Sequence, residues 1–138
     1  MTGIVMVNLN AGLLWEIFKH VRSWLTNLNR ASDARKLESI AALRKLISAS
    51  RETAVYIRQM NDTQQREHAV ETRLAVLWTE LGFALEDLGI HKLAKRCNIN
   101  GKQWANPGHY DADFIKKADV SLERMEQMAH FILLTIRH

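Results

Sequence analysis

The 138-residue sequence contains one cysteine, one proline and six glycines, and each scarcity excludes a class of protein. The single Cys97 rules out an intrachain disulfide framework and any zinc cluster built from several cysteines. So little proline and glycine argues against collagen-like, low-complexity or turn-rich all-β architectures. With 47% hydrophobic and 25% charged residues, the chain instead has the apolar side chains for one packed domain, which we expect to span residues 1–138.

The sequence also lacks a long uninterrupted hydrophobic run. The most apolar stretch, residues 4–25, is broken by Asn8, Asn10, Glu16, Lys19, His20 and Arg22. A membrane-spanning helix needs about 20 largely uncharged apolar residues, so no transmembrane segment is expected. Residues 1–10 contain no lysine or arginine, so the basic region of a signal peptide is missing. We therefore expect a cytoplasmic protein with a reduced Cys97.

Apolar residues recur at three- and four-residue steps over most of the chain, which predicts an all-α fold. Ser32 or Asp33 is expected to cap the second helix, and Gly89 to end the third. Because the second and third helices are joined by a short link, they should form a long antiparallel hairpin (residues 33–88) within a helical bundle. The steps predict four long helices at about 11–28, 33–60, 64–88 and 111–137, and a short basic helix, 91–97, within the loop segment 91–110.

Positive charge is concentrated in the first part of the chain. The net charge is +4, and residues 1–60 hold nine basic and four acidic residues. Arg44, Arg51 and Arg58 are spaced by seven, so they form a row on one side of the predicted helix 33–60. The predicted inward positions beside this row are Leu37, Ile40, Ile47, Ala54 and Ile57. Guanidinium groups beside an apolar seam need anionic partners, because a buried unpaired charge costs several kcal/mol.

Two kinds of partner for the arginine row remain open. Folding the hairpin about residues 61–63 predicts a ladder of ion pairs between its helices. The predicted pairs are Arg58 with Glu67, Arg51 with Glu71, and Arg44 with Glu80. Alternatively, the row binds phosphate groups of nucleic acid or an acidic protein, because guanidinium forks match phosphate oxygens.

A second basic region follows the hairpin. Residues 91–102 contain three lysines, one arginine and no acidic residue, and Trp104 follows closely. Such a cluster suits nucleic acid, because the ring can stack on a base while the cations meet phosphates. The segment also resembles a degenerate helix-turn-helix with its turn at Asn98; a short amphipathic helix before an asparagine-rich loop is the alternative. The residues predicted to bind nucleic acid or a partner are Arg44, Arg51, Arg58, Lys92, Lys95, Arg96, Lys102 and Trp104.

Motifs for catalysis are scarce. The histidines form no pair at i, i+4 spacing, and HExxH and a glycine-rich phosphate loop are absent, so we expect no metal and no cofactor. Arg124 and His130 have the Arg, five residues, His spacing and in this resemble small all-α ribonucleases of the HEPN type. That resemblance implies metal-independent RNA cleavage at a dimer interface, with His130 as acid–base and Arg124 on the phosphate. Residues six apart on a straight helix lie about 120° apart, so Arg124 and His130 would not share one side of the helix. The alternative is a solvated Arg124, with His130 paired to Glu126 one turn earlier.

These observations favour an interaction protein over an enzyme. The sequence predicts a non-enzymatic helical module, an oligomerising or accessory subunit of a larger complex that contacts nucleic acid through basic residues. We expect a homo-oligomer or a protein partner. The two alternatives are the metal-independent ribonuclease, whose RNA cleavage would be lost on His130→Ala, and a DNA-binding regulator, which would show sequence preference in a DNA-binding assay.

Overall fold

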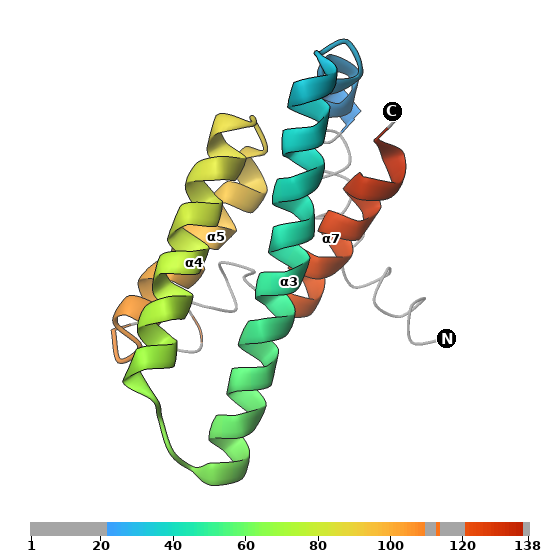
Figure 1. Cartoon of the computed structure of the whole chain (residues 1–138). Helices are drawn as coiled ribbons and strands as arrows, with labels where there is room; N and C mark the ends of the chain where they lie inside the picture. The colour runs from blue at the N-terminus through green and yellow to red at the C-terminus, as the bar shows by residue number, and fades with distance from the viewer. Residues whose placement is uncertain (1–21, 110–112, 114–120, 137–138) are drawn as a thin grey trace.

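The computed structural model describes residues 22–109, 113 and 121–136, and most of these residues are helical (Figure 1). Its named helices are α3 (Asp33–Thr63), α4 (His68–Asp87), α5 (His91–Ala105) and α7 (Leu122–Thr135). A further helical stretch at 22–29 precedes α3. The all-α prediction is confirmed; of the predicted end helices, residues 11–21, 111–112, 114–120 and 137 lie outside the described residues. Among the helices described here, none has the length and hydropathy to span a bilayer.

Local sequence sets two helix ends as predicted. The Oγ of Ser32 accepts a hydrogen bond from the backbone N of Arg35 at 3.3 Å, so Ser32 caps α3. At the end of α4, Gly89 has a φ of 84°, a left-handed conformation that glycine adopts without a steric penalty. At the end of α3, Gln64 takes a left-handed φ of 57°, and its N–H donates to the backbone O of Met60.

The helices form a bundle around the predicted hairpin. α3 and α4 pack against each other as the two arms, and residues 64–67 connect them. α5 runs back along α4, and α7 runs along α3 in the opposite direction to it (Figure 1). The largest fully buried apolar side chains are Trp78, Leu43, Leu46, Leu74, Leu81, Leu85, Met125 and Ile132. Full burial of each such side chain stabilises the fold by about 1.5–3 kcal/mol.

The buried face of α3 differs from the prediction. Ile40 and Ile47 are buried, but Leu37 is 62% exposed and Ala54 is also exposed. The reason is that α3 packs against both α4 and α7, so its buried face is wide and is centred between the two neighbours. The centre of that face consists of Leu43, Leu46, Ser50 and Thr53. The isoleucines mark only one edge of it.

The closest packing between described helices joins α4 and α5. A Cβ added to Gly101 would overlap Oγ1 of Thr79 and lie 3.1 Å from its backbone N. A Cβ added to Gly82 would overlap the side chain of Asn98. These contacts hold Asn98 and Gly101 inside a continuous helix, although both residue types usually favour turns. The helix predicted at 91–97 does begin at His91, but its predicted end is wrong, because α5 continues to Ala105.

Candidate functional site

Two large apolar side chains remain exposed on the outer side of α4. Val76 is 52% exposed and Phe83 is 61% exposed, and their seven-residue spacing places them on one line along the helix. Glu80 and Asp87 are also exposed and lie on the α3 side of this line, where both border a groove between α3 and α4. The apolar line therefore has an acidic edge.

The opposite edge of the apolar line belongs to α5. Lys95 and Lys102 are exposed, and helical periodicity places both on the outer side of α5, next to its contact with α4. Neither lysine forms an ion pair with a described residue. The acidic side chains of Glu80 and Asp87, the apolar line and the two lysines of α5 thus lie in that order across one surface. Glu86 lies on the α5 side of the line, where it is paired with His91. We call this surface the α4–α5 face; it consists of Glu80, Asp87, Val76, Phe83, Lys95 and Lys102.

The other predicted basic residues of this segment are less accessible. Arg96 is only 8% exposed, and its Nη1 lies 3.5 Å from the backbone O of Lys92. Lys92 is half-buried. His91, at the start of α5, has its Nδ1 3.0 Å from Oε1 of Glu86 on α4. Of the four cations predicted between residues 91 and 102, Lys95 and Lys102 are therefore the two that project fully from α5.

Trp104 lies in the core and not on a binding loop. It is 7% exposed, and its ring centroid is 5.6 Å from that of Tyr56 in an edge-to-face arrangement with an interplanar angle of 66°. Its buried Nε1 has no hydrogen-bond partner among the described residues. The prediction that Trp104 stacks on a base rested on a loop at this position. The extension of α5 to Ala105 turns the indole inward, so that prediction is wrong.

The helix-turn-helix interpretation is also wrong, because α5 has no turn at Asn98. Asn98 is half-buried where α5 meets Gly82 of α4, so its side chain fills the helix contact and does not start a recognition helix. Gly101 lies within the same helix against Thr79.

The arginine row on α3 is exposed, but the ion pairs predicted between these arginines and α4 do not form. Arg51 Nε lies 3.2 Å from Oε1 of Glu126 on α7, so the predicted pair with Glu71 is wrong. Arg44 and Arg58 form no ion pair with any described residue, and the pairs predicted for them with Glu80 and Glu67 are also wrong. The side of α3 that carries these arginines faces away from α4, and Arg51 therefore contacts α7.

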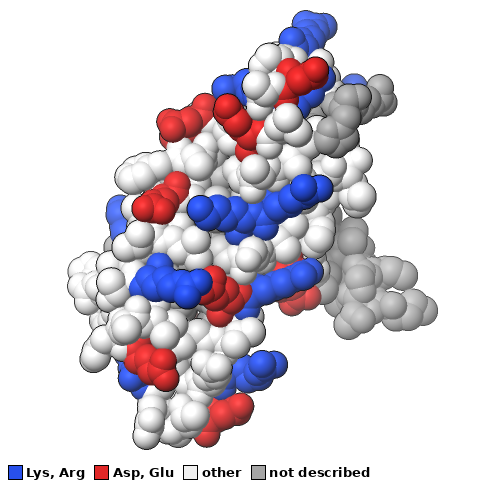
Figure 2. Space-filling view, in the orientation of Figure 1, with Lys and Arg blue, Asp and Glu red and all other residues white. Residues whose placement is uncertain are grey.

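Charges of both signs occupy the surface over α3 and α4. Figure 2 shows basic and acidic side chains interspersed on this face of the molecule. Arg73 of α4 and Glu52 of α3 form an ion pair across the hairpin. Arg51 points to α7 instead. The mixture offers no single-sign track for a phosphate backbone on the face in view.

Glu71 is a buried carboxylate that ties the hairpin connection to both helices. Its Oε2 accepts hydrogen bonds from Oη of Tyr56 at 2.8 Å and from Nε of Arg66 at 2.9 Å. Tyr56 Oη in turn accepts one from the backbone N of Glu67 at 2.9 Å. Burial by itself raises the pKa of Glu71, but the hydrogen bonds from Arg66 and Tyr56 outweigh it, so the pKa lies below its ordinary value. The Glu71 carboxylate therefore stabilises the fold.

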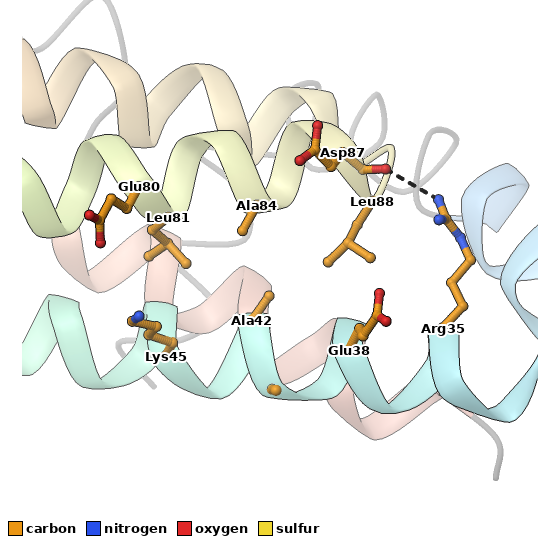
Figure 3. A pocket seen from close by; sticks show the side chains of 10 residues that line it. Arg35, Glu38, Ala42, Lys45, Glu80, Leu81, Ala84, Asp87 and Leu88 are labelled. Carbon is orange, nitrogen blue, oxygen red and sulfur yellow. Dashed lines mark hydrogen bonds between the residues drawn. The ribbon is translucent and has the colours of Figure 1, made fainter.

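A groove of about 470 Å³ opens between α3 and α4 (Figure 3). Its floor includes Ala42, Ala84 and Leu88, and the two small alanines on facing helices leave the space unfilled. Arg35 crosses one end, where its Nη2 lies 3.5 Å from the backbone O of Asp87. The charged lining residues are Arg35, Glu38, Lys45, Glu80 and Asp87. The groove borders the acidic edge of the α4–α5 face.

Arg124 and His130 both lie on α7, which is continuous from Leu122 to Thr135. His130 Nε2 lies 3.9 Å from Oε2 of Glu126, which confirms the predicted pairing one turn earlier. On a continuous helix the two side chains project about 120° apart, so they do not converge within one chain. A ribonuclease site shared between two chains stays a prediction.

Cys97 is a free cysteine that is fully buried in the core. Burial raises the pKa of its thiol far above the ordinary value, with a smaller opposing effect from Arg96, so the reactive thiolate is disfavoured.

Within residues 22–109, 113 and 121–136, no group of three or more His, Cys, Asp or Glu side chains is placed to hold a metal ion. No family model, curated protein or solved structure matches this chain.

The sequence indicated only the basic part of the α4–α5 face. Lys95 and Lys102 were predicted from their charge, whereas Val76 and Phe83 were missed. The available signal was their own seven-residue spacing, which runs beside the seam of Leu74, Trp78, Leu81, Leu85 and Leu88 and not within it.

Proposed function

We propose that the chain is a non-enzymatic helical interaction module that acts as an oligomerising or accessory subunit through the α4–α5 face. The observation that carries this proposal is the exposure of both Val76 and Phe83 on one line along α4. Exposed apolar area is favourable to remove from water, at about 25 cal/mol per Å², and apolar patches rimmed by polar residues are typical of protein interfaces. An aromatic side chain with charged neighbours is the usual centre of such an interface.

The charges around this pair favour a protein partner. Lys95 and Lys102 attract an anionic surface, while Glu80 and Asp87 repel one from the other edge. A polyphosphate backbone that lay across the face would meet both rows. A protein surface with its own basic and acidic rows complements both, and such matching mainly gives specificity and correct register.

Contact with nucleic acid is the second candidate. It is supported by the composition of α5, which contains three lysines, one arginine and no acidic residue, and by the projection of Lys95 and Lys102 from it. In this case the nucleic acid follows α5 alone, and binding weakens steeply as salt concentration rises.

Size-exclusion chromatography with light scattering tests the proposal, with protein purified both with and without nuclease treatment. An oligomerising module has a mass above the 15.9 kDa of one chain, with no excess absorbance at 260 nm. Co-purified nucleic acid that leaves at high salt would support the second candidate. A protein that stays monomeric at every concentration, carries no nucleic acid and retains no protein partner would contradict both.

A further inference from the structure

We infer that a second copy of this chain occupies the α4–α5 face, related by a two-fold axis that runs parallel to α4. The two α4 helices then run in the same direction. This inference rests on the proposed function and names its partner. The grounds are the order of the three rows on the face and the heights of their residues along the helices.

The order of the rows selects one orientation of the second copy. The acidic row lies on one side of the line formed by Val76 and Phe83, and the basic row on the other. A two-fold axis parallel to that line exchanges the two sides, so each acidic row meets the partner's basic row. An axis across the line keeps the sides and sets like charges against each other, which is unfavourable.

The heights of the charged residues match under this symmetry. Gly101 packs against Thr79, and Gly82 packs against Asn98, which fixes the register of α5 along α4. Lys102 follows Gly101 directly and therefore lies within about one helical turn, about 5 Å, of the height of Glu80. Counted from Asn98, Lys95 lies within about one turn of the height of Asp87 by the same reasoning.

A rotation about an axis parallel to α4 preserves these heights. Glu80 of one copy therefore meets Lys102 of the other, and Asp87 meets Lys95. Each pair occurs twice in the dimer, and both lie within the reach of a lysine side chain. Val76 and Phe83 lie near the axis, where each faces its own counterpart.

The size of the face is sufficient for a specific dimer. α4 has 20 residues and is therefore about 30 Å long, and two adjacent helices present a surface about 20 Å wide. The contact would cover about 600 Å² of each copy, or about 1,200 Å² in total, which is at the lower end of specific protein interfaces. A dimer of moderate affinity is expected.

Charge reversal tests this arrangement by sedimentation velocity, with circular dichroism to confirm that each variant is folded. Lys95→Glu with Lys102→Glu makes both edges acidic, and Glu80→Lys with Asp87→Lys makes both edges basic. Each double variant should raise the dimer dissociation constant at least tenfold. An equimolar mixture of the two should recover dimers. The matched control is Arg44→Glu with Arg58→Glu, an exposed pair on α3, which should leave the dissociation constant unchanged.

Cysteine cross-linking tests the direction of α4. Val76→Cys should form a disulfide-linked dimer with itself under mild oxidation, because the axis sets it against its own counterpart. The buried Cys97 should give no such product in the wild-type protein, and Ser48→Cys on α3 is the exposed control. Efficient cross-linking only between Val76→Cys and Phe83→Cys would show antiparallel α4 helices and overturn the inference.

The inferred dimer and the proposed interaction module are contradicted by different results. If the wild-type chain associates but both double charge variants keep the same dissociation constant, the inferred dimer is wrong and the interaction module stands. If the wild-type chain is monomeric at every concentration and carries no partner, the proposed function is itself wrong.

Discussion

At the scale of single residues, the most consequential polar group is the buried carboxylate of Glu71. It is 4% exposed and accepts hydrogen bonds from Tyr56 on α3 and Arg66 in the connection. Loss of a charged partner from a buried group usually costs more than loss of a surface ion pair. The carboxylate therefore holds the turn of the hairpin in place.

Glu71 should make stability depend on pH. Because its pKa is lowered in the folded protein, its contribution is fully present above the ordinary carboxyl pKa of about 4.3 and is lost as pH falls through the folded value. Glu71→Gln should lower the free energy of unfolding at pH 7 by about 1–3 kcal/mol and flatten its decline in acid. Urea unfolding from pH 7 down to pH 3 measures both effects.

Glu67→Gln is the control for this prediction. The Glu67 side chain is exposed, and its link to Tyr56 runs through the backbone N–H, which the substitution retains. This variant should behave like the wild type. An acid decline equally steep in Glu71→Gln and in the wild type would show that the Glu71 carboxylate is not the group responsible.

At the scale of helices, the contact between α4 and α5 depends on the absence of side chains. Replacing a glycine inside a helix by alanine normally stabilises the helix by about 1 kcal/mol. In Gly101→Ala, however, the new Cβ would overlap the side chain of Thr79. We expect a net loss of about 1–3 kcal/mol in the free energy of unfolding, measured by urea denaturation. Gly108→Ala is the control, because a Cβ at Gly108 meets nothing within 4 Å. A neutral or stabilising Gly101→Ala would contradict the close packing described for these helices.

The same contact explains what the sequence analysis could reach at this scale. The helical spacing of Leu74, Trp78, Leu81 and Leu85 indicates one apolar side of α4, and all four residues are buried in the structure. The end of α5 was not, because Asn98 and Gly101 favour turns locally and only the fit against α4 keeps them helical. Tertiary packing overrode local preference at that point.

The candidate site was predictable in part for a related reason. The positive charge of Lys95 and Lys102 is visible in the sequence, but exposure of Val76 and Phe83 depends on which side of α4 its neighbours cover. The arginine row shows the same limit. Its spacing predicted a shared side of α3, but the partner of Arg51 proved to be Glu126 on α7, which lies 75 positions away in the chain.

At the scale of the whole molecule, α3 and α4 each pack against two described helices, and no described helix covers the outer side of the α4–α5 pair. On that side, Lys95 and Lys102 form no ion pair with any described residue. We propose that association with another protein surface covers this side.

The measurement that tests this claim most directly is sedimentation equilibrium of three proteins: the wild type, Phe83→Ser and Leu37→Ser. Phe83 and Leu37 are almost equally exposed, at 61% and 62%, but only Phe83 lies on the α4–α5 face. Because Phe83 occurs twice in a dimer, its loss should raise the dissociation constant about tenfold to a hundredfold, while Leu37→Ser should match the wild type. Equal weakening by both substitutions, or weakening by Leu37→Ser alone, would contradict the assignment of association to this face.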